Sequence, residues 1–361
     1  MPGTTKRVLI VGKGEPETGG IASYMRMLVG SLDRTRFDPD FLNLARADAS
    51  GVGIWTVSNI MRSVVDLWRV FRRARGCDVV HIHTAFAPSS TAVRAVSLAL
   101  AARTRRATTV VHVHGGRVPG WLTSRSGRIL GRLAAMPVHH IVAVSAAAAA
   151  ALSELTSSEV TYVRNGVDLD TFRMRSERRN AVEPTVGFVG AFLPEKGIRE
   201  LLSASCQLAD QGIRHRLVVV GRGSLDWLDP GLHQDVTARS HIDVIGELSH
   251  GEMPSFYTTI DVLCLPSWSE ASPLVVTEAM AAGVAVVATD VGDVGTTVTS
   301  GVTGLVIPPR ELEPLVEALA SLLVDRDRTE AMGAAGREFA VVNLDWALTV
   351  GAVEAIYSRS G

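Results

Sequence analysis

The sequence predicts an α/β protein with two doubly wound, Rossmann-like domains that face each other across a cleft. A chain of 361 residues is too long for one ordinary domain and suits two. Short runs rich in valine and isoleucine alternate with helical patterns, which is typical of parallel sheets covered on both faces. The 33 glycines fit many tight strand–helix turns. Because such sheets bind ligands beyond the carboxyl ends of their strands, we expect the cleft there.

The first half is expected to form an N-terminal domain over residues 1–180. Its predicted strands are 7–11, 37–44, 78–83, 108–114, 140–144 and 160–164, and its predicted helices are 21–32, 59–75, 89–103, 126–135 and the alanine tract 146–151. Asn165-Gly166 then indicates a tight turn. A polar, arginine-rich segment at 171–183 separates this series from the next.

The second series is expected to form a C-terminal domain over residues 181–342. Its predicted strands are 185–190, 216–220, 242–245, 261–265 and 284–289, and its predicted helices are one that ends at residue 209, then 225–238, 253–258, 273–282, 314–323 and 329–342. A glycine-flanked hairpin or loop is expected at 301–306. The last segment, 343–361, is expected to be a helix that crosses back to the N-terminal domain.

The net charge of −1 hides an asymmetry between the halves. Residues 1–180 hold 25 lysines and arginines against 13 acidic residues, a net +12, and the remainder holds 11 against 24, a net −13. The basic half suits an anionic membrane surface or a phosphorylated acceptor, and solvated arginines are the alternative. We expect no nucleic acid partner.

Cysteine usage and the start of the chain favour the cytoplasm. Three scattered cysteines form no CxxC motif, and no signal-peptide pattern opens the chain. The longest low-charge stretches fall short of the roughly 18 residues that a membrane span requires. A peripheral position on the inner face of the cell membrane is left open by the basic half. Its predicted helix 59–75 sets apolar Ile60, Val64, Leu67 and Phe71 against four arginines, and packing of this stripe on a sheet is the alternative.

Residues 267–283 carry the most chemical information. Ser272 suits a helix N-cap, Pro273 the first helical position, and Gly283 the stop. The free N–H groups of such a helix start form a seat for phosphate. Glu270 precedes the helix and Glu278 lies in its second turn, so a carboxylate stands on either side of the seat.

These two glutamates are expected to bind hydroxyl groups, because a carboxylate repels phosphate and accepts hydrogen bonds. A phosphate between two polyol-binding groups indicates a nucleotide diphosphate sugar. The alternative is a capped surface helix with two solvated glutamates. Lys196, which opens a helix after the strand 185–190, can reach a diphosphate as a point charge, although a surface lysine beside Glu195 is the alternative.

The glycine-bearing loop 12–20 favours close approach of another molecule over dinucleotide binding. The GxGxxG spacing requires a small residue where Glu17 stands. Gly19 and Gly20 begin the next helix, so a ligand can approach the backbone there.

Four histidines form two pairs at strand ends, His81 with His83 and His112 with His114. Strand alternation puts each pair on one face. A zinc site is conceivable, but no cysteine or carboxylate nearby completes the ligation, and ordinary hydrogen-bonded core histidines are the alternative. His114, followed by two glycines, is the histidine best placed for a ligand in the cleft.

Together these residues resemble the family-four (group 1) retaining glycosyltransferases, which have the GT-B fold. The likeness covers nearly the whole chain and is most specific in residues 270–283, which read Glu-x7-Glu-Ala-Met-Ala-x-Gly. The family's other motifs stand in order at Gly19-Gly20, 78–83 (DVVHIH), 112–115 (HVHG), 165–168 (NGVD) and 195–197 (EKG).

The resemblance implies a role for each site residue. His114 would help to orient the transferred sugar, Glu270 would hold its hydroxyls, and Lys196 would neutralise the diphosphate. The donor-binding residues would be Gly19 and Gly20 beside the phosphates, Ser272, Leu274 and Val275 in the loop and helix start at the β-phosphate, and Glu278 at the ribose, with backbone 244–247 at the base. No cofactor and no metal is implied, and Asp168-Leu169-Asp170 belongs to the Asn-Gly turn.

Two departures from the family pattern stand out. Ala191 occupies the position where the family usually has an arginine, so one cation for the leaving diphosphate is missing. We hypothesise that Arg222 replaces it. Residues 291–296 also lack the acidic residue that the family often has near position 296.

The expected function is metal-independent, retaining transfer of a sugar from a nucleotide diphosphate sugar to an acceptor hydroxyl, in the synthesis of cell-envelope polysaccharide or glycolipid. The acceptor would be a glycan or a lipid-linked sugar. A GT-B-fold nucleotide-sugar epimerase and a non-catalytic glycosyltransferase-like subunit are the alternatives. The base and sugar of the donor stay open at this point.

Overall fold

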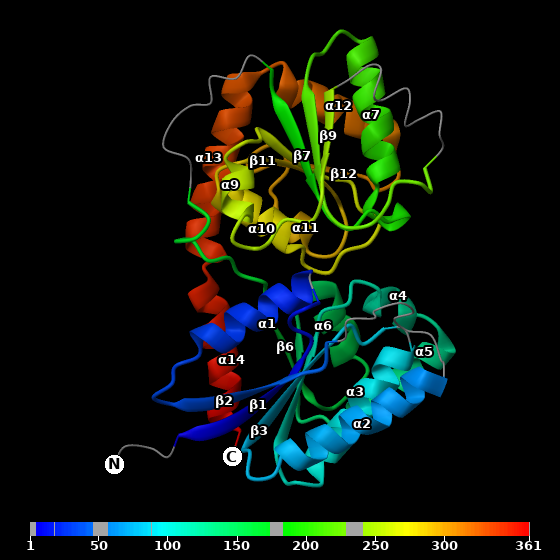
Figure 1. Cartoon of the computed structure of the whole chain (residues 1–361), viewed down its shortest axis with the longest axis vertical. Coiled ribbons are helices and arrows are strands. Elements are labelled where there is room, and N and C mark those ends of the chain that lie inside the picture. Colours follow the sequence, from blue (N-terminus) through cyan, green and yellow to red (C-terminus); the bar gives the residue numbers. More distant parts are fainter. Residues whose placement is uncertain are drawn as a thin grey trace. The chain divides into compact units, whose positions relative to one another are not determined.

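The protein, described from a computed structural model, divides into two compact units. The structure describes residues 5–17, 19–45, 57–87, 89–173, 183–228 and 241–360. One unit comprises Met1–Asn165 together with Ala347–Gly361, and the other comprises Gly166–Trp346 (Figure 1). The predicted boundary after residue 180 lies outside the described residues. Each unit holds a parallel six-stranded sheet among its described residues, so the predicted doubly wound α/β class is confirmed.

The N-terminal unit has the sheet order β2-β1-β3-β4-β5-β6, with every strand parallel to its neighbours. Its strands are β1 Lys6–Gly12, β2 Phe37–Asn43, β3 Val79–Thr84, β4 Thr108–Val113, β5 His140–Ala143 and β6 Glu159–Tyr162. Its helices are α1 Gly20–Ser31, α2 Val57–Arg73, α3 Ser89–Arg103, α4 Val118–Leu122, α5 Arg125–Ala135, α6 Ala146–Ser153 and all but the first residue of α14 Trp346–Arg359.

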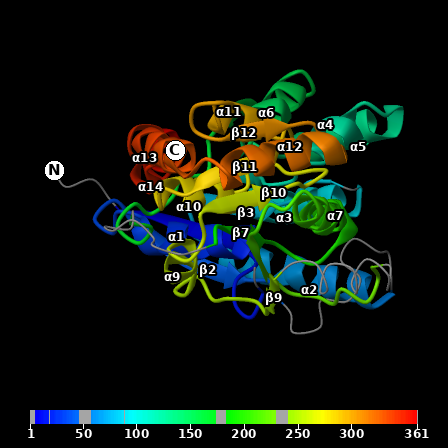
Figure 2. The same cartoon turned by 90° about the horizontal axis from the view of Figure 1, so that it is seen from above.

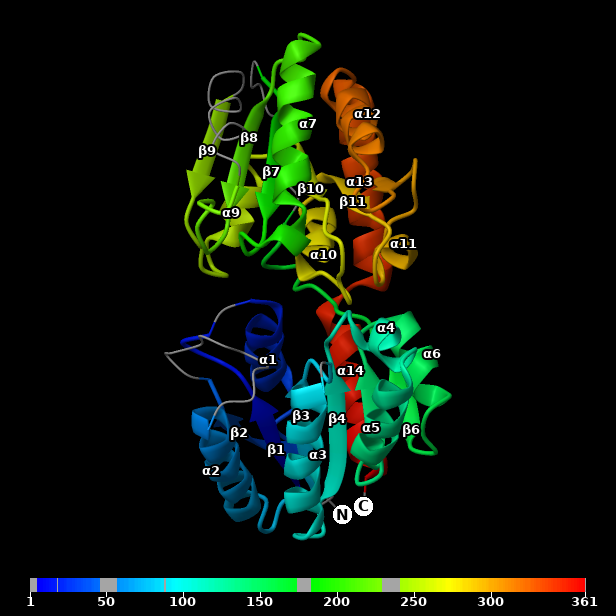
Figure 3. The ribbon, with the colours of Figure 1, turned by 90° about the vertical axis from the view of Figure 1, so that its right-hand side faces the viewer.

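The two faces of this sheet receive alternate side chains of the same strands, as the period of a β-strand requires. One set, including Leu9, Val80 and Val111, packs in one core with α2, α3, α5 and α6. The other set faces α1 and α14, where Tyr24 and Tyr357 are fully buried (Figure 3). Because both faces are covered, the central strands β1, β3, β4 and β5 are buried along most of their length.

The helix α14 is attached to the N-terminal unit by polar contacts as well as by Tyr357. The carboxylate of Glu354 accepts from the Asp33 N–H at 2.8 Å and lies 3.2 Å from Arg36. The Lys6 ammonium donates to the Tyr357 carbonyl oxygen at 3.2 Å. The last segment of the chain therefore closes the face of the sheet that α1 begins to cover.

The C-terminal unit has the sheet order β12-β11-β10-β7-β8-β9, again all parallel. Its strands are β7 Thr185–Val189, β8 Arg216–Val220, β9 His241–Ile245, β10 Val262–Leu265, β11 Ala285–Thr289 and β12 Leu305–Ile307. Its helices are the 3-10 turn η1 Pro194–Lys196 and α7 Ile198–Asp210, α9 Met253–Tyr257, α10 Leu274–Ala281, α11 Val294–Thr297, α12 Leu312–Leu323 and α13 Arg326–Asn343.

This sheet separates two cores. One core contains residues of α7 and α12, and the other contains residues of α9, α10 and α13, so α7 and α9 lie on opposite faces of β7 (Figure 2, Figure 3). Of the helix predicted at 225–238, residues 225–228 form turns and residues 229–238 lie outside the described residues. The segment predicted as a hairpin or loop at 301–306 contains a turn that leads into β12, which is paired in parallel with β11.

Two helical glycines provide a matched test of packing. A Cβ on Gly333 in α13 would lie 2.2 Å from the Gly283 carbonyl oxygen, whereas a Cβ on Gly351 in α14 would meet nothing within 4 Å. We expect Gly333→Ala to lower the melting temperature by several degrees, because overpacking a core costs about 1–3 kcal/mol. Gly351→Ala should leave it unchanged or raise it, since alanine favours a helix over glycine by about 1 kcal/mol. Equal melting temperatures, measured by calorimetry, would contradict the packing.

Candidate functional site

The chemistry-bearing residues of the C-terminal unit gather where its strand order reverses. β7 is flanked by β10 on one side and β8 on the other, and the carboxyl ends of β7 and β10 lead into the loops that carry Lys196 and Glu270. Open α/β sheets bind ligands at such a reversal. The Lys196 Nζ and the Glu270 Oε1 form an ion pair at 2.6 Å. The Ser267 hydroxyl donates to the same Glu270 oxygen at 2.8 Å.

The two loops are held together by their backbones. The Trp268 N–H donates to the Glu195 carbonyl oxygen at 2.8 Å. Gly197, which ends η1, has a left-handed φ of 70°, and a Cβ there would lie 1.9 Å from the Pro266 carbonyl oxygen. Only glycine fits this position without displacing the loop after β10. This backbone contact fixes the two loops relative to each other, and it thereby brings the side chains of Lys196 and Glu270 together.

The helix α10 begins one residue later than predicted. Its N-cap is Pro273, so the predicted N-cap position of Ser272 is wrong. Proline at this position has the extended backbone that an N-cap needs, and Ser272 is buried in the preceding loop. Leu274 and Val275 start the first turn, where N–H groups have no acceptor four residues back. The Val276 N–H donates to the Pro273 carbonyl oxygen at 3.1 Å.

The end of α10 agrees with the prediction. Gly283 has φ 73°, the left-handed conformation that stops a helix. The Val284 N–H donates to Ala279 at 2.9 Å and the Gly283 N–H to Met280 at 3.0 Å, which is the bond pattern of a Schellman motif. The short helix is therefore fixed at its carboxyl end by glycine, while its amino end keeps donors directed toward the loop 267–273.

Glu278 lies in the second turn of α10 and is buried beside α9. The Tyr257 hydroxyl donates to its Oε2 at 2.9 Å. Burial raises the pKa of Glu278 from 4.5 to about 7, and the bond from Tyr257 opposes that rise. Burial also holds the pKa of Tyr257 well above its usual value, so the hydroxyl stays neutral and can donate. Sequence reasoning missed Tyr257, because it lies 21 residues away in the chain and no motif marks it.

Arg222 is exposed in the loop after β8. Its carbonyl oxygen accepts from the Phe192 N–H at 2.8 Å, directly beside Ala191. The Gly190 N–H donates to the Val220 carbonyl oxygen at 3.0 Å. The backbone that carries Arg222 is therefore bonded to the loop in which the family's arginine is missing.

In the N-terminal unit, the predicted glycines start α1. Gly19 is the N-cap, with φ 105°, a backbone conformation that other residues rarely adopt. Both Gly19 and Gly20 are exposed, and a Cβ on Gly19 would meet nothing within 4 Å. The described residues therefore leave space for another molecule to approach the backbone of this loop, which is the approach that the sequence predicts.

His114 follows β4, and its N–H donates to the Thr84 carbonyl oxygen at 2.8 Å. The next residue, Gly115, packs so tightly that a Cβ would lie 2.0 Å from the Ala85 carbonyl oxygen. His114 is half-buried, and burial lowers its pKa to about 3. It is therefore neutral at physiological pH.

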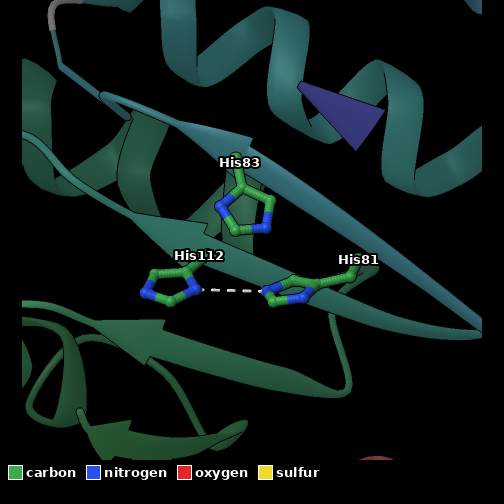
Figure 4. A group of neighbouring side chains, drawn as sticks. All are labelled: His81, His83 and His112. Carbon is green, nitrogen blue, oxygen red and sulfur yellow. Dashed lines mark hydrogen bonds between the residues drawn. The ribbon is translucent and has the colours of Figure 1, made fainter. Parts of the chain in front are cut away.

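The two histidine pairs form one cluster, to which β3 and β4 each contribute. His81, His83 and His112 offer three ring nitrogens that all lie within 4.8 Å of one another (Figure 4). Among the described residues, these three histidines are the group that could hold a metal ion. The group contains no carboxylate and no thiolate. A buried dication would then have no anionic ligand to offset its desolvation, so the cluster fits ordinary neutral histidines better.

The chain has the fold of GT-B glycosyltransferases. The sucrose-phosphate synthase of Thermosynechococcus elongatus superimposes with a TM-score of 0.80 at 19 % identity, over 98 % of both chains. The Anabaena protein HepE, solved with UDP and glucose, gives a TM-score of 0.76 at 18 % identity, over 98 % of this chain and 99 % of that one.

The family follows from the sequence comparisons. Residues 18–171 match the family described as Glycosyltransferase Family 4, and residues 170–339 match Glycosyl transferases group 1. The chain belongs to this family, as the resemblance of its motifs predicted. A GDP-mannose-dependent alpha-(1-6)-phosphatidylinositol monomannoside mannosyltransferase of Mycobacterium tuberculosis is 32 % identical over 205 residues, which are 53 % of each chain. The match thus spans about half the length of this curated relative.

The raised pKa of Glu278 predicts a pH-dependent effect on stability. A carboxyl that titrates near 4.5 when unfolded and near 7 when folded makes its full contribution to stability below pH 4.5 and loses it as the pH rises through 7. We expect Glu278→Gln to melt like the wild type at pH 4.5 and several degrees higher at pH 8, where it removes a buried charge worth on the order of 3 kcal/mol. Melting curves at both pH values test this, and a constant difference between them would refute the shift.

Proposed function

We propose that the chain transfers a sugar, with retention and without a metal ion, from a nucleotide diphosphate sugar to an acceptor hydroxyl. The observation that carries this proposal is the arrangement at the strand reversal of the C-terminal unit. There Lys196 is paired with Glu270, and the loop 267–273 leads into the first turn of α10. Family membership supports sugar transfer as the reaction.

The chemical difficulty is the departure of a diphosphate from the anomeric carbon. Cations and N–H groups placed where negative charge develops lower this barrier. Lys196 supplies one cation and Arg222 supplies a second. The amides of Leu274 and Val275 supply dipoles at the helix start. These protein groups take the place that a divalent ion would otherwise have on the diphosphate.

The carboxylates bind hydroxyls of the donor. Glu270, which is paired with Lys196, holds the sugar. Glu278 holds the ribose, and its proton must leave before it can accept two hydroxyl bonds as a carboxylate. Tyr257, which already donates to Glu278 at 2.9 Å, keeps that side chain in position.

Retention follows if the acceptor attacks from the face that the diphosphate leaves. The departing phosphate then accepts the acceptor's proton, so the chemistry needs no carboxylate on the opposite face. His114 and the glycines at Gly19 serve the sugar and the phosphates in this scheme. A neutral His114 suits such a role, because an imidazolium beside the anomeric carbon would oppose positive charge developing there.

A thermal-shift screen with UDP, GDP and ADP tests donor binding and identifies the base, because a ligand that binds the folded chain raises its melting temperature. We expect one diphosphate to give a clear rise and Lys196→Ala to abolish most of it. The matching sugar nucleotide should then be consumed only with an acceptor. An isomerised sugar without acceptor would instead indicate an epimerase, and binding without turnover on any acceptor would indicate a non-catalytic subunit.

The proposed substitution of Arg222 for the missing arginine has a matched control. Arg222 follows β8, whereas Arg214 is exposed before the same strand begins. We expect Arg222→Ala to lower kcat/KM for the donor by about ten-fold or more, since a charge-assisted bond contributes roughly 1.5–3 kcal/mol. Arg214→Ala should be indistinguishable from the wild type. Steady-state kinetics decide, and equal values for both variants would exclude Arg222.

We propose that the N-terminal unit, which would bind the acceptor, contacts an anionic membrane. A lipid-linked acceptor of cell-envelope synthesis would lie there. The helix α2 exposes Met61, Val64, Val65, Trp68 and Phe71, which recur at helical spacing. Arg72 stacks on Trp68 at 4.7 Å and Arg105 on Phe71 at 3.6 Å. Apolar side chains interleaved with arginines suit an interface of acyl chains and anionic headgroups.

This stripe differs from the predicted one. Leu67 packs against the core and not outward, because it faces the sheet side of α2, and the Ile60 side chain lies outside the described residues. Among the described residues, no helix combines the length and the apolar character that crossing a bilayer requires. The Mycobacterium tuberculosis relative is named as a phosphatidylinositol monomannoside mannosyltransferase, which supports a lipid-linked acceptor for this chain.

Liposome sedimentation tests the membrane proposal. We expect binding to vesicles that contain phosphatidylglycerol at low salt, weaker binding in 0.5 M salt, and little binding to neutral vesicles, because arginine–headgroup attraction is screened. Trp68→Ser should reduce binding several-fold, whereas Val342→Ser, which removes a still more exposed apolar residue from α13, should not. Absence of the wild type from anionic pellets at low salt would refute the proposal.

A further inference from the structure

The buried histidines form a hydrogen-bonded array, and the proton positions of its His83–His114 pair can be deduced. His83 Nδ1 lies 2.9 Å from His114 Nε2, and His112 Nδ1 lies 3.2 Å from His81 Nε2. His81 Nδ1 lies 2.5 Å from the Tyr357 hydroxyl oxygen. In each pair, the Nδ1 of one ring therefore contacts the Nε2 of the other. Tyr357 of α14 is the hydrogen-bond partner at one end of the array.

Two ring nitrogens of the array are buried without a hydrogen-bond partner among the described residues. They are the Nε2 of His83 and the Nε2 of His112. The ring of Tyr24 lies edge-on to His112 and His114, with centroids 4.9 and 5.0 Å away, and closes the cluster on the α1 side. The unpartnered nitrogens face a surrounding of rings and not solvent.

All four rings are neutral. Burial lowers the pKa of His81 and His114 to about 3, and it holds those of His83 and His112 well below the usual value, with neighbouring histidines adding to the effect. A neutral imidazole carries one proton, so one of its nitrogens donates and the other accepts.

The unpartnered nitrogens decide which one donates. A buried N–H without an acceptor costs about 1–3 kcal/mol, and orphaned N–H groups are rarer in proteins than under-satisfied acceptors. The Nε2 of His83 is therefore the bare nitrogen, and its proton is on Nδ1. That Nδ1–H donates to His114 Nε2, which must then be the acceptor, so the proton of His114 is on its own Nδ1.

The second pair ends on a hydroxyl, which can also donate. With the proton of His112 on Nδ1, His81 donates from Nδ1 to the Tyr357 hydroxyl oxygen, and the buried O–H of Tyr357 then has no acceptor in the array. With the opposite tautomers, Tyr357 donates to His81, and the Nε2–H of His112 is the donor without an acceptor among the described residues. Each assignment leaves one buried donor unpaired, so these contacts determine the tautomers of His83 and His114 alone.

We propose that this array presents His114 to the substrate as an Nδ1–H donor, and that His83 is the positioning residue that fixes this tautomer. The inference rests on the proposed function for the nature of the substrate, whose hydroxyl oxygen would accept the bond. A nitrogen that donates cannot also take a proton there, so His114 orients the sugar and does not act as a general base. The acceptor's proton then goes to the departing phosphate.

Nitrogen NMR of the full chain with ¹⁵N-labelled histidine tests the assignment without any activity assay, because protonated and bare ring nitrogens have well-separated shifts. Resonances are assigned from single His→Asn variants. We expect all four histidines to be neutral at pH 7, with His83 and His114 as Nδ1–H tautomers. A His114 resonance of the Nε2–H tautomer, or of a cation, would overturn the proposal. One zinc ion per chain by elemental analysis would overturn it too, because the array would then be a metal site.

Kinetics of isosteric variants test the consequence. Asparagine places its amide nitrogen near the position of Nδ1, and glutamine near that of Nε2. We expect His114→Asn to keep kcat/KM within about ten-fold of the wild type and His114→Gln to lose about a hundred-fold, as for removal of one aimed donor. Likewise His83→Asn should rescue most of the loss in His83→Leu, with matching changes in the His114 nitrogen shifts. A greater loss in the asparagine variants would contradict the proposal.

The two proposals fail in different ways. If the nitrogen shifts agree with the assignment but no sugar is transferred from any donor, the proposed function is wrong and the array stands as described. If transfer is found while His114 carries its proton on Nε2, the proposed function stands and the tautomer is wrong.

Discussion

The constraint on which the structure depends is that both sheets are parallel and buried on both faces. A strand so buried can place few polar groups along its length, because each one must find a partner away from water. Chemistry is therefore concentrated at the carboxyl ends of the strands. In the C-terminal unit, Lys196 and Glu270 meet beyond β7 and β10, where the strand order reverses. In the N-terminal unit, His114 follows β4 in the same way.

The histidines within β3 and β4 show what the same constraint does to polar groups that remain inside. His81, His83 and His112 are buried, and burial keeps them neutral. Four of the contacting ring nitrogens pair with one another, and His81 Nδ1 pairs with Tyr357, which comes from the opposite end of the sequence. This last contact forms only when α14 packs on the sheet, so the last helix contributes to the core of the N-terminal unit.

Charge at the strand reversal of the C-terminal unit is balanced by similar means. Lys196 and Glu270 neutralise each other at 2.6 Å, and burial favours the protonated form of Glu278. In the proposed reaction, Lys196 and Arg222 would be the cations that meet the diphosphate. The Arg222 carbonyl oxygen accepts from the N–H of Phe192, the residue after Ala191.

Much of the fold was predictable because its signals are local. Apolar runs of four to six residues marked the strands, and Gly283 marked the end of α10 through its left-handed backbone. Less local features were predicted poorly. Ser272 has the composition of an N-cap, yet Pro273 takes that position, because the packing of the preceding loop decides where the helix starts. Leu67 seemed part of an outward stripe until the sheet beneath α2 determined which face is inward.

The sequence by itself determined the fold class, the family and the identity of the residues with useful chemistry, since these follow from periodicity, composition and motif spacing. Tertiary structure alone decided what those residues contact. Tyr257 contacts Glu278, Gly197 packs against the loop after β10, and Tyr357 contacts His81 only because the tertiary fold packs these elements together. Proton positions and pKa values depend on burial and on such contacts, and no spacing within a sequence records either.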